Sequence, residues 1–279
     1  MTISTTFIGR LLLGLLIVFS SIVHSADGKL LAATGVQQFE GSAGGGLVPW
    51  AVLAGNASRD EFAVTSFVTE IELDDFRLRA VGLGFTIHDR FEFGYAEQKL
   101  KVKPLNTNVR QQVFSVKARL FGDIVYSDWP QVSASFVHKR INNSLINESE
   151  DNSGSEFYIA ITKYHLAALN NRNILWNLTI RATEANQTGL LGFGGPKDNI
   201  SLQVETSVAL QLNRGVFVGL DYRLKPDNLA TVEEDAWANL FIRYLPNKHF
   251  NVTAAYLDFG DIAGLRNQSG VYFSLSANL

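Results

Sequence analysis

Residues 200–212 form the stretch that most constrains the fold, because apolar and polar residues alternate in it without a break. The stretch reads ISLQVETSVALQL, and every even-numbered position carries an apolar or β-branched side chain. A repeat of two places these side chains on one face of a β-strand, so that this face meets an apolar phase and the other meets water. The stretch is longer than a typical globular strand, whereas about 9–11 residues suffice for a tilted strand to cross a bilayer. The alternation therefore predicts a membrane-spanning strand.

The same pattern recurs along the rest of the chain. Candidate strands begin near residues 61, 75, 90, 109, 131, 155, 174, 199, 216, 235, 249 and 270. Most connections between them alternate between short turns and longer loops, as they do in bacterial barrels and not in a soluble sandwich, which is the alternative all-β fold. We therefore predict an all-β protein, with a transmembrane antiparallel β-barrel of about 12 strands over residues 61–279. Fourteen strands are the alternative, since residues 30–40 and 47–54 could add a pair.

The N-terminus indicates export. Arg10 precedes the apolar run LLLGLLIVF, and small residues follow this run up to Ser25. This order is typical of a signal peptide, here residues 1–25, and the run is short for an uncleaved anchor, which is the alternative. We expect the protein in the outer membrane of a Gram-negative bacterium. Its expected partners are the lipid and lipopolysaccharide of that membrane, the barrel-assembly machinery and a small solute.

Composition excludes several classes of protein. Because the sequence contains no cysteine, it has neither disulfides nor thiolate metal sites. The net charge of -3 gives no reason to expect a nucleic-acid partner. The GFGG motif at residues 192–195 lacks the lysine–serine pair of a phosphate loop, and the acidic residues of the loop 142–154 lack the spacing of a calcium loop. We therefore expect no cofactor and no metal.

Residues 26–60 differ from the rest of the chain, because glycines cluster at positions 41 and 44–46 and Pro49 interrupts a strand-like run. Proline is poorly tolerated in a central strand. We interpret the stretch as a periplasmic segment that can fold into the lumen as a plug. The predicted second and third strands place small residues on the lumen face, which leaves room for an inserted segment or for a pore: Gly82, Gly84, Gly94 and Ala96.

Several long motifs resemble an uncharacterised family of exported proteins of Gram-negative bacteria. They lie at residues 40–55, 181–195, 222–229, 234–237, 246–249 and 255–263. The resemblance spans nearly the whole mature chain and implies an outer-membrane-type protein. The family supplies neither catalytic residues nor a known substrate, so the resemblance carries no site residue over.

Eight charged residues have the parity of the lumen face in the predicted strands. They are Lys117, Arg119, Lys139, Arg181, Glu205, Asp221, Arg223 and Arg243. Cations outnumber anions among them, which would weakly favour small anionic solutes; the alternative is that these charges pair with one another. We predict a narrow channel or transporter, gated by the N-terminal segment or by inward loops such as the apolar stretch 190–193. The alternative is a closed barrel with a structural, lipopolysaccharide-binding or receptor role.

A basic cluster lies on the predicted outer surface near the extracellular end. A tight turn at residues 88–90 places Arg79 opposite Lys99 and Arg77 opposite Lys101 on adjacent strands. Directly opposed like charges destabilise a strand pair, so an anionic group should compensate them. We interpret the four residues as contacts for lipopolysaccharide phosphates, with a solvated basic rim as the alternative.

The sequence gives little support for an enzyme, although a lipid-modifying outer-membrane enzyme is a minor alternative. Acyl transfer needs a nucleophile and a base on one face, within hydrogen-bond reach. His138 is predicted to face lipid, but Ser135 on the same strand has the opposite parity. No other nucleophile–base spacing stands out, and we therefore expect no catalytic residues.

Overall fold

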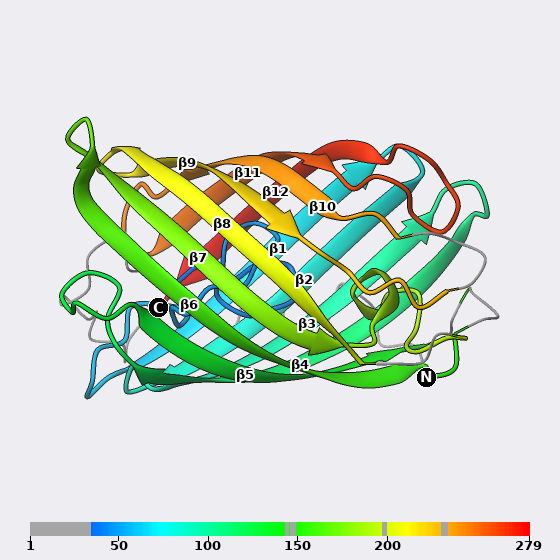
Figure 1. Cartoon of the computed structure of the whole chain (residues 1–279), viewed down its shortest axis with the longest axis horizontal. Coiled ribbons are helices and arrows are strands. Elements are labelled where there is room, and N and C mark those ends of the chain that lie inside the picture. The colour runs from blue at the N-terminus through cyan, green and yellow to red at the C-terminus, as the bar shows by residue number, and fades with distance from the viewer. Residues whose placement is uncertain (1–34, 143–144, 146–148, 197–199, 230–233) are drawn as a thin grey trace.

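Twelve antiparallel strands close into a single barrel in the computed structural model, which describes residues 35–142, 145, 149–196, 200–229 and 234–279 (Figure 1). The strands are β1 (Phe62–Leu73), β2 (Phe76–Ile87), β3 (Phe91–Val102), β4 (Thr107–Phe121), β5 (Gln131–Ile141), β6 (Ser153–Leu169), β7 (Arg172–Thr183), β8 (Ser201–Asn213), β9 (Val216–Arg223), β10 (Trp237–Tyr244), β11 (Phe250–Asp258) and β12 (Ser269–Asn278). Each strand pairs with its neighbours in sequence, and β12 pairs with β1. Twelve strands are confirmed. The alternative of 14 strands is wrong, because residues 35–57 form only isolated bridges.

Strand β8 shows how the alternation builds the wall. Its even-numbered residues, such as Leu202 and Val208, are exposed on the outer surface. Its odd-numbered residues Glu205 and Ser207 are buried inside the barrel. The polar face meets the N-terminal segment and not water, because the indole nitrogen of Trp50 donates a hydrogen bond to Ser207 Oγ at 2.9 Å. A strand in this barrel therefore separates an apolar exterior from a packed interior.

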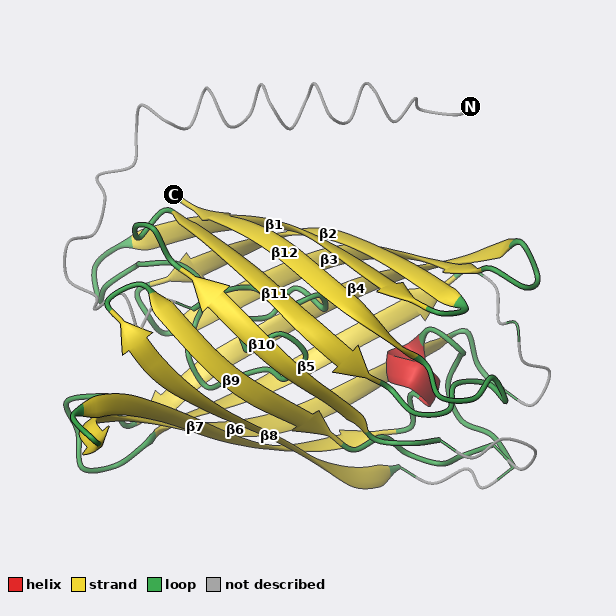
Figure 2. Cartoon of the chain, turned by 90° about the horizontal axis from the view of Figure 1, so that it is seen from above, coloured by secondary structure: helices red, strands yellow, loops and turns green. Residues whose placement is uncertain are grey.

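The two ends of the barrel carry different connections (Figure 2). The connections at the end where the C-terminus lies include the turns 88–90, 170–171 and 214–215. The opposite end carries the long loops 142–152, 184–200, 224–236 and 259–268. Short turns face the periplasm and long loops face the exterior in bacterial barrels, so we name the two ends periplasmic and extracellular on this basis.

Residues 35–57 lie inside the barrel, coloured blue in Figure 1, and isolated bridges join Gly35 to Gly55, Gln37 to Ala43 and Gly44 to Pro49. Every residue of this segment is buried. We call it the inner segment. The predicted signal peptide, residues 1–25, lies outside the described residues. In the described part of the chain, no helix is long and apolar enough to cross a membrane.

Candidate functional site

The candidate site is the interior of the barrel, and small residues in the wall make room there for the inner segment. A Cβ atom added to Gly84 in β2 would lie 2.6 Å from Gln37 Nε2 of the inner segment. A Cβ atom added to Gly94 in β3 would lie 2.9 Å from the carbonyl oxygen of Gly41. Gly41 itself turns the chain with a φ of 91°, which a residue with a Cβ adopts only at a cost. The glycines of the wall and of the segment therefore fit one another.

Glu92 in β3 binds the backbone of the inner segment at two places. One carboxylate oxygen, Oε1, accepts hydrogen bonds from Ala43 N and Ser42 Oγ, each at 3.0 Å. The other, Oε2, accepts a hydrogen bond from Ala54 N at 2.6 Å. The Glu92 side chain is fully buried, so these hydrogen bonds form out of contact with solvent. A buried carboxylate requires such donors, because without them its burial is costly.

Lys117 in β4 complements Glu92 from the neighbouring strand. Its ammonium group donates to the carbonyl oxygens of Ala43, Trp50 and Val52 at 3.0, 3.0 and 3.1 Å. These three carbonyl groups use all three protons of the ammonium group. Lys117 Nζ also lies 3.6 Å from Glu92 Oε1. Glu92 and Lys117 therefore hold residues 42–43 and 50–54 of the inner segment from one side of the barrel.

Asp221 in β9 holds the segment from the other side. Its Oδ2 accepts hydrogen bonds from the N–H groups of Gly46 and Leu47, both at 3.0 Å, and from Asn239 Nδ2 at 3.0 Å. A Cβ atom added to Gly45 would lie 2.7 Å from Asp221 Oδ1, so a larger residue would displace this carboxylate. The glycine run therefore lets the backbone approach a wall carboxylate closely.

Glu40 at the tip of the inner segment joins a buried network of wall charges. It accepts from Lys139 Nζ at 2.5 Å and from Arg223 Nη1 at 2.8 Å, and Arg181 Nη2 lies 3.8 Å away. Two wall carboxylates complete the network. Glu156 binds Lys139 at 2.9 Å and Arg181 at 2.7 Å, and Glu205 binds Arg181 at 2.5 Å and Arg223 at 3.3 Å. Three cations thus face three anions, one of which the inner segment supplies.

The structure places seven of the eight predicted lumen residues inside the barrel. Arg119 is the other; it lies at the periplasmic end, where it pairs with Asp89 and with Asp123. The sequence prediction missed the inward carboxylates Glu92 and Glu156, which balance the cations. Their position between outward residues was a usable signal, since Glu92 lies between Phe91 and Phe93. Together with Glu40, the charges in the middle of the lumen, between its two ends, are five cations and five anions among the described residues: Lys117, Lys139, Arg181, Arg223 and Arg243 against Glu40, Glu92, Glu156, Glu205 and Asp221.

The loop between β7 and β8 lies at the extracellular end of the barrel and folds inward. It contains the short 3₁₀ turn η2 (Asn186–Gly189), drawn red in Figure 2, and then the buried Leu190 and Leu191. The carbonyl oxygen of Thr188 accepts a hydrogen bond from the Lys139 ammonium at 3.1 Å. Gln187 and Thr188 have φ angles of 44° and 61°, which cost about 1–3 kcal/mol for each residue. We call residues 185–193 the lid; its backbone is strained and its apolar side chains face inward.

An ion pair at the extracellular end ties the lid to the next loop. Lys225 Nζ lies 3.4 Å from Glu234 Oε2 and donates to Gln187 Oε1 at 2.9 Å. Gln187 Nε2 in turn donates to Glu234. Burial lowers the pKa of Lys225 to about 8 and raises the pKa of Glu234 to about 7, in each case against the effect of the partner's charge. Both groups therefore change their protonation state close to neutral pH.

The basic cluster has the predicted register. Arg79 lies opposite Lys99, and Arg77 lies opposite Lys101. Strand β1 supplies acids on one side, since Arg79 Nε lies 3.3 Å from Glu70 and Arg77 Nε lies 3.3 Å from Glu72.

On the other side of Lys99, strand β4 supplies another cation. Lys99 lies opposite Arg110, so that three cations form a row from β2 to β4: Arg79, Lys99 and Arg110. Within the described residues no carboxylate forms an ion pair with Lys99 or Lys101. We call Arg77, Arg79, Lys99, Lys101 and Arg110 the basic row.

His138 has a serine partner that the sequence did not indicate. Its Nδ1 lies 3.0 Å from Oγ of Ser155, which is directly opposite on β6 and not on the same strand. A nucleophile–base pair needs a third group that orients the base, and donors that stabilise an oxyanion. Among the described residues, no side chain binds the other ring nitrogen of His138.

These features define the class of protein: a twelve-stranded β-barrel of the outer-membrane type whose interior holds residues 35–57 of its own chain. The chain belongs to the family DUF3034, described as a protein of unknown function, which matches residues 33–276. The family resemblance noted in the sequence is thereby confirmed. No curated protein matches the chain.

Solved structures of outer-membrane proteins align with the chain. The KdgM porin aligns with a TM-score of 0.52 at 7% identity, over 76% of this chain and 98% of that chain. The outer-membrane protein Omp33 of Acinetobacter baumannii gives a TM-score of 0.49 at 8% identity, over 80% of this chain and all of that chain. The NanC porin gives 0.47 at 11% identity, over 76% of this chain and 97% of that chain. The similarity to the KdgM porin shows a shared fold.

Proposed function

We propose that this protein is an outer-membrane channel for small solutes and that the inner segment is its gate. One observation carries the proposal: the barrel closes by its own β1–β12 pairing, and the inner segment adds no strand to it. The segment is attached through hydrogen bonds to side chains of the wall, chiefly those of Glu92, Lys117 and Asp221. It can therefore leave the lumen without breaking any strand pairing.

The lumen that remains would be lined with charge. Withdrawal of the inner segment removes Glu40, so that the five wall cations then face four wall carboxylates. A pore lined in this way would conduct small ions with a weak preference for anions, because selectivity follows the charges that line the pore. Specific recognition of a solute would then depend on the extracellular end.

Single-channel recording in a planar bilayer tests the proposal. We would compare the mature protein with a variant that lacks residues 26–60, after verifying that both barrels are folded by circular dichroism and by heat-modifiable migration in a gel. Frequent large steps from the shortened variant, and rare steps from the intact protein, are the expected result. Silence from a correctly folded shortened variant would reject the channel.

We also propose that the basic row binds lipopolysaccharide phosphates, as a second role of the outer surface. Lys99 supports this role, because it lies between Arg79 and Arg110 without a carboxylate partner among the described residues. Charge-assisted hydrogen bonds to phosphate would offset the repulsion between Lys99 and the two arginines. Replacing Arg77, Arg79, Lys99 and Lys101 with glutamine should lower the amount of lipopolysaccharide that co-purifies with the protein. An unchanged amount would reject this role.

A further inference from the structure

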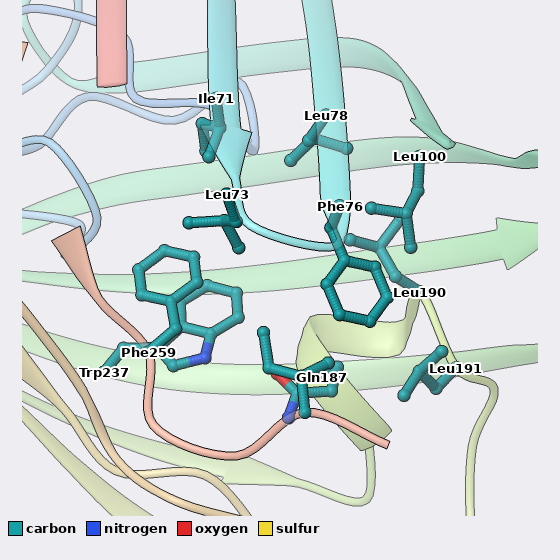
Figure 3. A pocket seen from close by; sticks show the side chains of 11 residues that line it. Ile71, Leu73, Phe76, Leu78, Leu100, Gln187, Leu190, Leu191, Trp237 and Phe259 are labelled. Carbon is teal, nitrogen blue, oxygen red and sulfur yellow. The ribbon is translucent and has the colours of Figure 1, made fainter. Parts of the chain in front are cut away.

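An apolar cavity lies between the lid and the extracellular end of the barrel wall (Figure 3). Strands β1 to β3 contribute Leu73, Phe76 and Leu100, and the lid contributes Leu190 and Leu191. Trp237 and Phe259 form the remaining side as a stacked pair, with ring centroids 3.9 Å apart and an interplanar angle of 5°. The cavity has a volume of about 30 Å³, which is room for roughly two water molecules.

Water is a poor occupant for this cavity, because its walls offer too few hydrogen-bond partners. Nearly all the lining side chains are apolar, and the amide of Gln187 is turned to the ion pair of Lys225 and Glu234. A water molecule needs two to four polar partners to be held. An apolar molecule would be held by contact with the leucines and the aromatic rings instead.

One buried donor at the cavity lacks a partner. Among the residues that the structure describes, no acceptor binds the indole N–H of Trp237, although only 3% of the residue is exposed. A buried polar group of this kind is costly unless something satisfies it. An oxygen atom on a molecule in the cavity would accept this hydrogen bond. Within the described part of the chain, the cavity therefore combines apolar walls with one unsatisfied donor, which is the pattern of a small-molecule site.

Trp237 also contacts the parts of the molecule that close the lumen. The Lys225 ammonium, which binds the lid, lies 5.0 Å from its ring centroid. The ring of Phe39, next to Glu40 at the tip of the inner segment, lies 6.2 Å from that of Trp237. A molecule bound against Trp237 would therefore lie beside both the lid and the inner segment.

We propose that this cavity is the extracellular recognition site of the channel, for a small molecule that carries one apolar ring or branched chain and one hydroxyl or carbonyl oxygen. The role of the site in recognition rests on the proposed channel function. Binding of the ligand to the cavity can be measured independently of conduction. The ligand packs between the lid leucines and Leu73, and its oxygen accepts from Trp237 Nε1. The cavity must widen to admit such a ligand, so Leu190 and Leu191 withdraw as it enters.

Phenol serves as the probe, because it has one ring and one hydroxyl group, and glucose serves as the polar comparison. We would measure equilibrium binding of each to the full-length mature protein in lipid nanodiscs by calorimetry. The variant Trp237→Phe keeps an aromatic ring and loses the donor, and Ile262→Trp fills the cavity. Ile242→Trp is the matched control, because Ile242 lies on the outer surface of β10.

We expect saturable phenol binding to the wild type and to Ile242→Trp, about tenfold weaker binding to Trp237→Phe, and none to Ile262→Trp. We expect no binding of glucose. Equal phenol binding to all four proteins, or no saturable binding to the wild type, would overturn the proposed site. If phenol binds as expected but the shortened variant never conducts, the recognition site stands and the channel fails. If the shortened variant conducts and phenol does not bind, the channel stands and this site fails.

Discussion

Glu92 and Lys117 lie directly opposite each other on β3 and β4, and together they bind both sides of Ala43 in the inner segment. The Ala43 N–H donates to Glu92, and the Ala43 carbonyl accepts from Lys117. The two side chains lie 3.6 Å apart, so each neutralises the other while it holds the segment. One cross-strand charge pair thus connects a wall hairpin to the segment that closes the lumen.

Replacing Glu92 with glutamine should loosen the gate. The change removes a buried charge and leaves Lys117 uncompensated, and breaking a buried pair in this way costs about 3–5 kcal/mol. We expect the intact protein to open at least tenfold more often in single-channel recordings. The matched control is Glu97→Gln, which lies on the outer face of the same strand and should not change the opening rate. Equal rates in the two variants would contradict the role of Glu92.

The open pore should prefer anions weakly, because five wall cations face four wall carboxylates once Glu40 has left. The reversal potential of the variant lacking residues 26–60, measured in a potassium chloride gradient, should therefore indicate a small excess of chloride flux. Adding Arg243→Gln equalises the charges and should bring the reversal potential close to zero. A preference for cations in the shortened variant would contradict this assignment of the lumen.

The lid should open most readily between pH 7 and 8. Burial raises the pKa of Glu234 to about 7 in this closed structure; if opening the lid returns this pKa to its ordinary lower value, the closed state gains stability as the pH falls below 7. Closing lowers the pKa of Lys225 to about 8, again because of burial, so the closed state also gains stability as the pH rises above 8. The neighbouring charges Arg223, Asp227 and Asp235 shift these values in smaller steps.

Thiol labelling would measure this pH dependence, because the natural chain has no cysteine. The buried Leu190→Cys would report on the lid, and the exposed Leu105→Cys would correct for the reactivity of the thiol itself. The labelling rate of Leu190→Cys, divided by that of Leu105→Cys, should fall between pH 7.5 and pH 5.5, because the lid opens less often. A ratio that rises over this interval would contradict the linkage to Glu234.

We propose that the protein has no lipid-hydrolysing activity, despite the contact between His138 and Ser155. The geometry lacks an orienting group for His138 among the described side chains, so Ser155 should remain a weak nucleophile. Purified protein should release no fatty acid from phospholipid micelles above the level of a Ser155→Ala variant. A release that depends on Ser155 would make the protein an enzyme.

Most of the barrel could be predicted from the two-residue alternation of apolar and polar side chains, because each strand must keep one face apolar across the bilayer. This alternation predicts where the strands start and the register of β2 with β3. It also predicts that Lys139 and Arg223 point inward. Contacts between segments far apart in the sequence do not follow. Nothing local shows that Glu40 meets Arg223, because their contact depends on the path of a glycine-rich segment that has no periodicity. The same holds for Ser155, which reaches His138 only through the strand pairing.

The central claim, that the inner segment is the gate, is tested most directly by locking it to the wall. A Cβ atom on Gly41 would lie 3.3 Å from that of Ala96, close to the separation of about 3.5–4.5 Å found in disulfides. We would record Gly41→Cys/Ala96→Cys channels that also carry Glu92→Gln, before and after reduction in the same bilayer. The single-cysteine variants would control for the strain of a side chain at Gly41.

The account predicts a silent channel while the disulfide is intact and frequent steps after dithiothreitol is added. Gel migration without reductant would verify the cross-link beforehand. Steps of equal size and frequency before and after reduction would contradict the account, because a tethered segment would then leave the pore unobstructed.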